Sequence, residues 1–200
     1  MQTFLCVRVR VIEFIKNYNN NAALATAGAL AAAANSNDNA NATTESAAAG
    51  VKAEILVSPL KGEAVDLSEV EDDVFASGAM GQGIAIKPAE GVLHSPVAGT
   101  VMMVFPTGHA IGLKSDNGAE ILIHLGMDTV NLQGKGFETL VEKGQSVQPG
   151  QELIKFDLDG IQKQGYDLTS PVVITNSKDY ESVKADLGSV EVGQNLLELK

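Results

Sequence analysis

The chain has 200 residues, of which 25 are acidic and 14 basic, and its formal net charge of -11 at pH 7 argues against nucleic acid and anionic membranes as partners. It contains no run of about 18 consecutive apolar residues, so no membrane span is expected. The only cysteine, Cys6, cannot form an internal disulfide, which fits a reducing cytoplasm.

The first fifty residues differ in composition from the rest. From Asn17 to Gly50 the chain is mostly Asn, Ala, Ser and Thr, which supply too little apolar surface to offset the entropy of ordering. We therefore expect residues 1–50 to be a disordered, low-complexity tail or interdomain linker, and residues 51–200 to form one acidic domain. A secretory signal is the alternative for the basic and Ala-rich stretch from Arg8 to Ala34, although its apolar run is nearly all alanine.

Within the domain, the apolar segments are short and rich in β-branched residues. They are bounded by Gly, Pro or Asp and lie at residues 55–57, 83–87, 97–104, 152–156 and 172–175. Many short strands at this spacing predict an all-β domain, an antiparallel sandwich or barrel. Helix is expected only in brief pieces, at residues 67–72, 137–141 and 158–164.

Two motifs are repeated along the domain. A Ser-Pro motif begins at Ser58, Ser95 and Ser170, and a longer motif that ends in Gly-Gln-x-Leu begins at Ser146 and Ser189. Each copy is too small to bury its own apolar face. The copies are therefore expected to pack together as duplicated hairpin motifs.

Two of the three histidines flank a predicted β-hairpin. Alternating segments lie on both sides of Ser115–Gly118, whose Asn-Gly step favours a tight turn. With a four-residue loop, His109 lies directly opposite His124. With a two-residue loop, His124 lies opposite Ile111, which shares a face with His109. Only a one-residue slip would separate the two imidazoles.

The two histidines are predicted to share that face with mostly apolar neighbours, namely Thr107, Ile111, Leu113, Glu120 and Leu122. Histidine titrates near pH 6.5, and an apolar setting keeps its neutral, nucleophilic form populated at cellular pH. The alternative is a pair of structural histidines whose hydrogen bonds are satisfied. His94, the third histidine, is expected to be structural or on the surface.

Several short motifs occur in a fixed order along the domain: Ser58–Glu63, Asp72–Phe75, Gly81–Pro88, Ser95–Thr100, Thr107–Ala110 and His124–Val130. In this order and spacing they resemble the glucose-type enzyme IIA (EIIA) domain of the bacterial phosphoenolpyruvate-dependent sugar phosphotransferase system. The resemblance covers residues 54–200 and excludes the first fifty.

The resemblance implies a cytoplasmic phosphotransferase component. It would accept a phosphoryl group on His124 from the histidine phosphocarrier protein HPr and pass it to a IIB domain of a sugar permease during sugar uptake. In that family His109 stabilises the phosphoryl group and Thr107 orients His109. The backbone carbonyl of Gly126 would hold His124, and Asp128 would modulate the site. For Asp128 the alternative role is to cap the turn after the strand.

The resemblance also implies a partner-binding rim formed by Val74, Phe75, Phe105 and Leu122. Regulated transporters or kinases are further candidate partners, besides HPr and the IIB domain. No cofactor is expected to be required. Two imidazoles and a carboxylate from a partner can bind zinc, so His109 and His124 are also candidate zinc ligands at a partner interface.

Two other classes of protein share parts of this pattern. Zinc peptidases of related β architecture use H-x-x-x-D together with H-x-H, and His124–Asp128 supplies only the first of these elements. Biotinyl and lipoyl carrier domains need an exposed lysine in a hairpin, typically between methionines. Met102 and Met103 have no lysine between them.

Overall fold

Fourteen short strands and two short α-helices make up residues 51–200, the part of the chain that the computed structural model describes. The expectations for residues 1–50, a linker or a secretory signal, lie outside the described residues. The strands are β1 (Glu54–Val57), β2 (Gly62–Val65), β3 (Gln82–Pro88), β4 (Val92–His94), β5 (Gly99–Val104), β6 (Ala110–Ser115), β7 (Glu120–His124), β8 (Phe137–Thr139), β9 (Ser146–Val147), β10 (Glu152–Phe156), β11 (Ser170–Ile174), β12 (Val183–Ala185), β13 (Gly188–Val190) and β14 (Asn195–Leu199).

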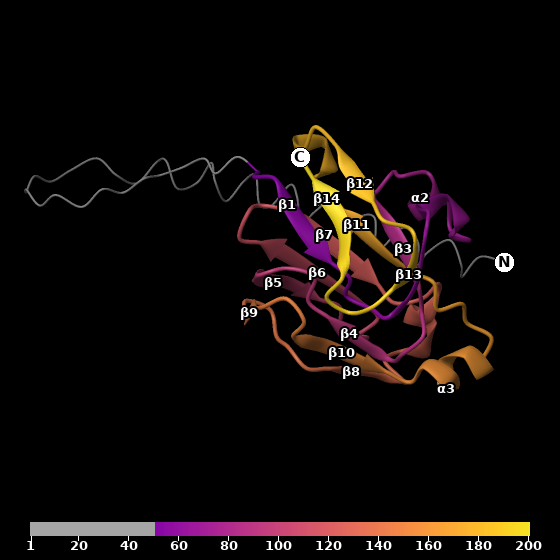
Figure 1. The fold of residues 1–200 in the computed structure, drawn as a ribbon. Helices are drawn as coiled ribbons and strands as arrows, with labels where there is room; N and C mark the ends of the chain where they lie inside the picture. Colours follow the sequence, from indigo (N-terminus) through magenta and orange to yellow (C-terminus); the bar gives the residue numbers. More distant parts are fainter. Residues whose placement is uncertain (1–50) are drawn as a thin grey trace, which may run out of the picture. The chain divides into compact units, whose positions relative to one another are not determined.

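The strands form three antiparallel sheets (Figure 1). The largest has the order β13-β2-β3-β11-β7-β6-β5-β9, and the two smaller sheets have the orders β1-β14-β12 and β4-β10-β8. Within the described residues every strand pairing is antiparallel. The sheets pack as a sandwich, which confirms the fold class expected from the strand spacing.

The helical pieces are few and short. The α-helices are α2 (Asp73–Ala76) and α3 (Leu158–Lys163), and the 3-10 helices are η1 (Leu67–Glu69), η2 (Thr129–Leu132) and η3 (Ser177–Asp179). The helix expected at residues 158–164 is confirmed as α3. The helix expected at residues 137–141 is wrong, because Phe137–Thr139 pairs with β10 as strand β8. At residues 67–72 only η1 forms, and the chain is extended again at Val70.

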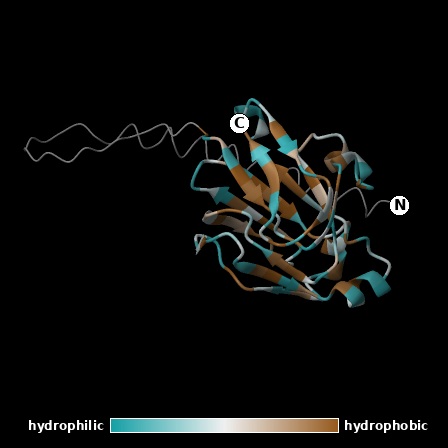
Figure 2. Ribbon diagram, viewed as in Figure 1, coloured by the Kyte–Doolittle hydropathy of each residue, from teal (hydrophilic) through white to brown (hydrophobic). Residues whose placement is uncertain are grey.

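A single apolar core fills the space between the sheets. Figure 2 shows hydrophobic residues along the strands and hydrophilic residues mainly on the loops and on α3. Fully buried side chains come from all three sheets, among them Leu56, Ile84, Ile123, Leu153 and Val172. Since no isolated hairpin of this size could bury such a face, the duplicated motifs depend on one another for stability.

The Ser-Pro copies make a recurrent buried turn. Ser58 Oγ donates to the Leu60 carbonyl, and Ser95 Oγ donates to the Val97 carbonyl, each at 2.7 Å. Both serines are fully buried. Ser170 is also fully buried, but its hydroxyl donates backwards, to the carbonyl of Leu168, at 2.7 Å. The third copy therefore has a different hydrogen-bond pattern from the first two.

Candidate functional site

The β6–β7 hairpin has a three-residue loop. Lys114 pairs with Glu120, and the Ser115 amide donates to the Ala119 carbonyl at 2.9 Å, so the chain turns through residues 116–118. Gly118 has φ +103°, a conformation that L side chains rarely adopt. Both loop lengths expected from the sequence are therefore wrong by one residue, and the register is shifted by one.

The shifted register changes which side chains share a face. Ile111 pairs with Ile123 across the hairpin, and both are buried in the core. His124 pairs instead with Ala110, on the opposite face of the sheet. The expectation that Ile111 and Leu113 share a face with His124 is wrong, because the strand alternation places them in the apolar core.

The two imidazoles are nevertheless adjacent. His109 lies just before the first residue of β6, and Gly108 has φ +66°, so strand alternation does not extend to His109. The ring centroids of His109 and His124 are 4.9 Å apart, with an interplanar angle of 77°. Both histidines are buried, with relative exposures of 1% and 7%. The predicted proximity is confirmed, although the predicted register is not.

Hydrogen bonds fix the orientation of each ring. His124 Nδ1 lies 2.7 Å from the Gly126 carbonyl oxygen, which can only accept. His124 Nδ1 therefore carries the hydrogen, and in the neutral ring Nε2 keeps a lone pair. His109 Nδ1 lies 2.5 Å from the Thr107 hydroxyl. His109 Nε2 is buried and has no hydrogen-bond partner among residues 51–200.

Burial keeps both imidazoles neutral. Burial, with a smaller contribution from His124, lowers the pKa of His109 to about 3. Burial also lowers the pKa of His124, while the Gly126 carbonyl and the carboxylates of Asp72 and Asp128 act in the opposite direction. At neutral pH the site therefore holds two uncharged rings, of which one presents a nucleophilic nitrogen.

Two carboxylates approach the pair from different elements. Asp128 is exposed and has φ 56°, and its side chain makes no capping hydrogen bond to η2. The alternative role as a cap is therefore not observed. Asp72 precedes α2, and its Oδ1 accepts from the Val74 amide at 2.9 Å. Asp72 begins the motif Asp72–Phe75, but no role in the site was expected for it, although an aspartate directly before a short helix is a typical capping pattern.

An aromatic ring packs against each imidazole. The Phe75 ring centroid lies 5.6 Å from that of His124, and the Phe105 ring centroid lies 5.3 Å from that of His109. Phe75 and Leu122 are buried, whereas Val74 and Phe105 are partly exposed. Of the four expected rim residues, Phe75 and Phe105 are thus seen in ring contact with the histidines.

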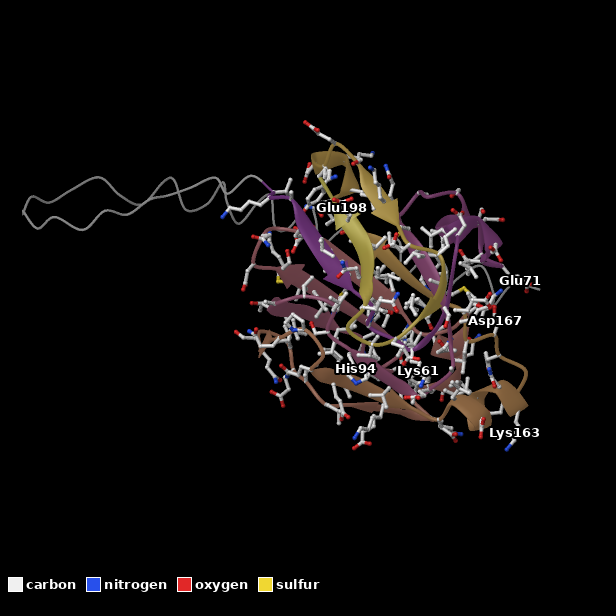
Figure 3. The ribbon with its side chains drawn as sticks, in the orientation of Figure 1. Lys61, Glu71, His94, Lys163, Asp167 and Glu198 are labelled. Atoms are coloured by element: carbon white, nitrogen blue, oxygen red, sulfur yellow. The ribbon has the colours of Figure 1, made fainter. Side chains whose placement is uncertain are left out.

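His94 lies apart from this arrangement. It is on β4, in a different sheet, and pairs with Glu152 of β10 (Figure 3).

Within residues 51–200, no group of three or more His, Cys, Asp or Glu side chains is placed to hold a metal ion. In the same residues no helix is long and apolar enough to cross a membrane.

Comparisons with known proteins agree on one family. Residues 54–180 match the family model described as phosphoenolpyruvate-dependent sugar phosphotransferase system, EIIA 1. A glucose-specific EIIA component of Bacillus cereus is 48% identical over 135 residues, which are 68% of this chain and 82% of that protein. A beta-glucoside-specific EIIBCA component of Bacillus subtilis is 50% identical over 147 residues, 73% of this chain. The chain spans only 24% of that longer relative.

A solved structure shares the fold. The glucose permease IIA of Mycoplasma capricolum superposes with a TM-score of 0.69 at 38% sequence identity. The match covers 74% of this chain and 97% of the Mycoplasma chain. The family resemblance drawn from the motifs and the antiparallel β-sandwich are therefore both confirmed.

Proposed function

The chain belongs to the EIIA 1 family of the phosphoenolpyruvate-dependent sugar phosphotransferase system, and from this premise we propose that it carries a phosphoryl group on His124, taken from HPr and passed to a IIB domain of a sugar permease. The observation that carries this proposal is the bond from His124 Nδ1 to the Gly126 carbonyl, which leaves Nε2 as the nucleophile. The relatives are named for glucose and beta-glucosides, and we propose uptake of a sugar of this class.

Phosphoryl transfer requires little covalent chemistry from the protein. His124 Nε2 attacks the phosphorus of the donor phosphohistidine, a new N–P bond forms, and the donor N–P bond breaks with its electron pair remaining on the donor imidazole. The same exchange, with roles reversed, delivers the group to the acceptor. The contribution of the site is to hold donor, phosphoryl group and acceptor in line and to stabilise the charge on the phosphoryl oxygens.

His109 fits the stabilising role. If the Thr107 hydroxyl donates to His109 Nδ1, the ring hydrogen lies on Nε2, the nitrogen that lacks a partner in the structure. A phosphoryl oxygen on the neighbouring His124 is then a natural acceptor for that N–H. Because the pKa of His109 is lowered to about 3, the ring is neutral before a phosphoryl group is bound.

The surroundings suit protein partners with basic surfaces. The carboxylates of Asp72 and Asp128, which are partly exposed and exposed, act on His124. Oppositely charged surfaces speed encounter and fix the orientation of docking. Val74 and Phe105 supply the apolar part of the docking surface, and the buried Phe75 and Leu122 keep water from the labile N–P bond. HPr and a IIB domain are the proposed partners in the cytoplasm, with regulated transporters or kinases as additional ones.

No metal is needed for this transfer. The Nε2 atoms of His109 and His124 would be suitable zinc ligands once His109 Nε2 has given up its hydrogen, but a tetrahedral site needs two more ligands. We therefore propose zinc only as an alternative ligand at an interface where a partner adds a carboxylate. The rival classes of zinc peptidase and biotinyl or lipoyl carrier are set aside, because the family match spans both histidines.

The test is direct phosphorylation of the full chain. The protein is incubated with phosphoenolpyruvate, enzyme I and HPr, and its intact mass is measured before and after mild acid treatment. We expect the mass of one phosphoryl group to be gained, and to be lost in acid as for a phosphoramidate. A chain that gains no mass, or that keeps the group in acid, would disprove the assignment.

A further inference from the structure

The turn after His124 is held by a segment distant in sequence, Asp167–Ser170, which leads into β11. The Met127 amide donates to the Asp167 carbonyl oxygen at 2.7 Å, and the Gly126 amide donates to Ser170 Oγ at 3.3 Å. The two segments also touch closely. A Cβ atom on Gly126 would lie 2.7 Å from the Asp167 carbonyl oxygen. Both amides beside the Gly126 α-carbon are thus bonded to one segment.

One peptide group connects this segment to the imidazole. The carbonyl of Gly126 and the amide of Met127 belong to the same planar unit and point in opposite directions. The carbonyl accepts from His124 Nδ1 at 2.7 Å, and the amide donates to the Asp167 carbonyl at 2.7 Å. A continuous chain of hydrogen bonds therefore runs from the ring to Asp167. Such chains strengthen one another, because each bond polarises the next.

The segment itself is made rigid by its own side chains. Ser170 Oγ donates to the Leu168 carbonyl at 2.7 Å. The Asp167 carboxylate accepts from the Thr169 amide at 2.9 Å and from the Thr169 hydroxyl at 2.8 Å. Asp167 is exposed (Figure 3), whereas Ser170 is fully buried. Ser170 is thus the buried side chain that bonds both the segment and the turn.

Comparison of the three Ser-Pro copies shows which of their serines contacts the His124 turn. Ser58 and Ser95 are buried to the same degree as Ser170, and each donates its hydroxyl to a backbone carbonyl at the same 2.7 Å. Of the three, Ser170 is the one whose hydroxyl accepts from an amide of the His124 turn. We propose that Ser170 is a positioning residue for His124, which holds the Gly126 carbonyl where it keeps the ring hydrogen on Nδ1.

Loss of this hydroxyl has a defined consequence. The buried Gly126 amide loses its acceptor, and the turn relaxes to find another. The Gly126 carbonyl then no longer favours Nδ1–H over Nε2–H, so part of the His124 population loses its nucleophilic Nε2 lone pair. For histidines that ligate metals, removing an outer hydrogen-bond partner typically costs roughly ten- to a hundredfold in affinity or activity, and we take the lower end of this range as a guide. We expect roughly a tenfold slower transfer, because the Met127 bond to Asp167 remains.

The test compares Ser170→Ala with Ser95→Ala in the full chain. Both substitutions remove one buried hydroxyl and its 2.7 Å bond to a carbonyl, so the two variants match in the local change. The first readout is the ¹⁵N NMR spectrum of the imidazoles in the unphosphorylated protein. We expect an Nε2-protonated population of His124 in Ser170→Ala and none in Ser95→Ala. Ser170→Thr, which keeps a hydroxyl, restores the Nδ1–H form.

The second readout is the single-turnover rate of phosphoryl transfer from phosphorylated HPr, which rests on the proposed function. We expect roughly a tenfold lower rate constant in Ser170→Ala, with unchanged affinity for HPr, and a wild-type rate in Ser95→Ala. Identical imidazole spectra in the two variants would overturn the proposal. If even the wild-type chain takes no phosphoryl group, the proposed function fails, while the spectra still decide the positioning role. Should Ser170→Ala not fold, Ser170→Cys, a near-isosteric side chain with weak hydrogen bonds, takes its place in both measurements.

Discussion

The two ends of the β6–β7 hairpin differ in whether their buried polar groups are hydrogen-bonded. At the turn end, Ser115 Oγ donates to Glu54 Oε1 at 2.6 Å and accepts from the Ala119 amide at 2.9 Å. At the other end, His109 Nε2 is buried with no hydrogen-bond partner among the described residues. An unpaired buried polar group costs about 1–3 kcal/mol, so the histidine end bears a free-energy cost that the turn end avoids.

This difference in hydrogen bonding indicates that the turn end of the hairpin serves stability and the histidine end serves function. The turn end joins β1 to the hairpin through fully made bonds, and its task is to fix the register. The histidine end keeps two neutral rings side by side, with the unpaired His109 Nε2 next to the ring whose Nε2 keeps a lone pair. Buried polar groups are normally hydrogen-bonded, and a group bound at His124 would supply the missing partner for His109 Nε2.

The largest effect is expected from removal of the nucleophile. His124→Ala should abolish phosphoryl acceptance from HPr, because His124 is the ring whose Nδ1–H is bonded to a backbone carbonyl and whose Nε2 is thereby left as the nucleophile. Intact-mass measurement after incubation with the phosphoryl donors checks this. His94→Ala is the matched control, since His94 lies on β4 in another sheet, and it should be labelled normally. Full labelling of His124→Ala would refute the assignment.

The second effect is a defect in passing the group on. His109→Gln should still accept a phosphoryl group but should deliver it to the IIB domain roughly ten- to a hundredfold more slowly, because the oriented ring donor is lost. Quench-flow measurement of transfer from the phosphorylated variant to the IIB domain gives the rate. Transfer at the wild-type rate would show that His109 has only a packing role.

At the turn end the expected effect is on stability alone. Ser115→Ala leaves the Ala119 amide and the Glu54 carboxylate without their partner, and should lower the free energy of unfolding by about 1–3 kcal/mol. The phosphoryl-transfer rate should not change. Urea denaturation measures the first quantity, with the exposed Ser189 replaced by Ala as the control. A large loss of transfer in a folded Ser115→Ala would contradict the separation of the two ends.

The last effect concerns the pH dependence of folding. His109 binds a proton in the unfolded chain below about pH 6.5, but in the folded chain its pKa is lowered to about 3. The stabilisation that this histidine shows above pH 6.5 is therefore lost as the pH falls, by up to about 1.4 kcal/mol per pH unit until the folded form also binds the proton. His109→Gln should show a shallower decline in urea denaturation series between about pH 6.5 and 4. Parallel declines for the two proteins would refute the depressed pKa.

The sequence predicted the fold class and the histidine pair for different reasons. Short β-branched segments and turn residues suffice for an antiparallel sandwich, because strand length and spacing are local properties. The pair was predicted from a hairpin register that proved to be wrong. The predicted proximity of the two histidines was still correct, because His109 precedes β6 and the positive φ of Gly108 changes the direction of the chain there. The family motifs, which contain both histidines, pointed to the same pair.

The parts that could not be predicted are those set by contacts between distant segments. Phe137–Thr139 was expected to be helical, but pairing with β10 makes it a strand. The hydrogen bond from the Gly126 amide to Ser170 joins residues 44 positions apart, and the local sequence around neither residue predicts it. Asp72 was overlooked because its influence on His124 depends on where α2 packs and not on a spacing along the chain.

The pairing of β1 with β14 has a consequence for how the domain is completed during synthesis. Figure 1 shows the two strands side by side, and Glu54 pairs with Leu199 although the whole domain lies between them. Among the described strands, β14 is the only partner of β1. The first described strand can therefore complete its ladder only when the last described strand is available to pair with it. Closure of this small sheet is expected to be the final, slow step of folding, since pairing over a long loop is entropically costly.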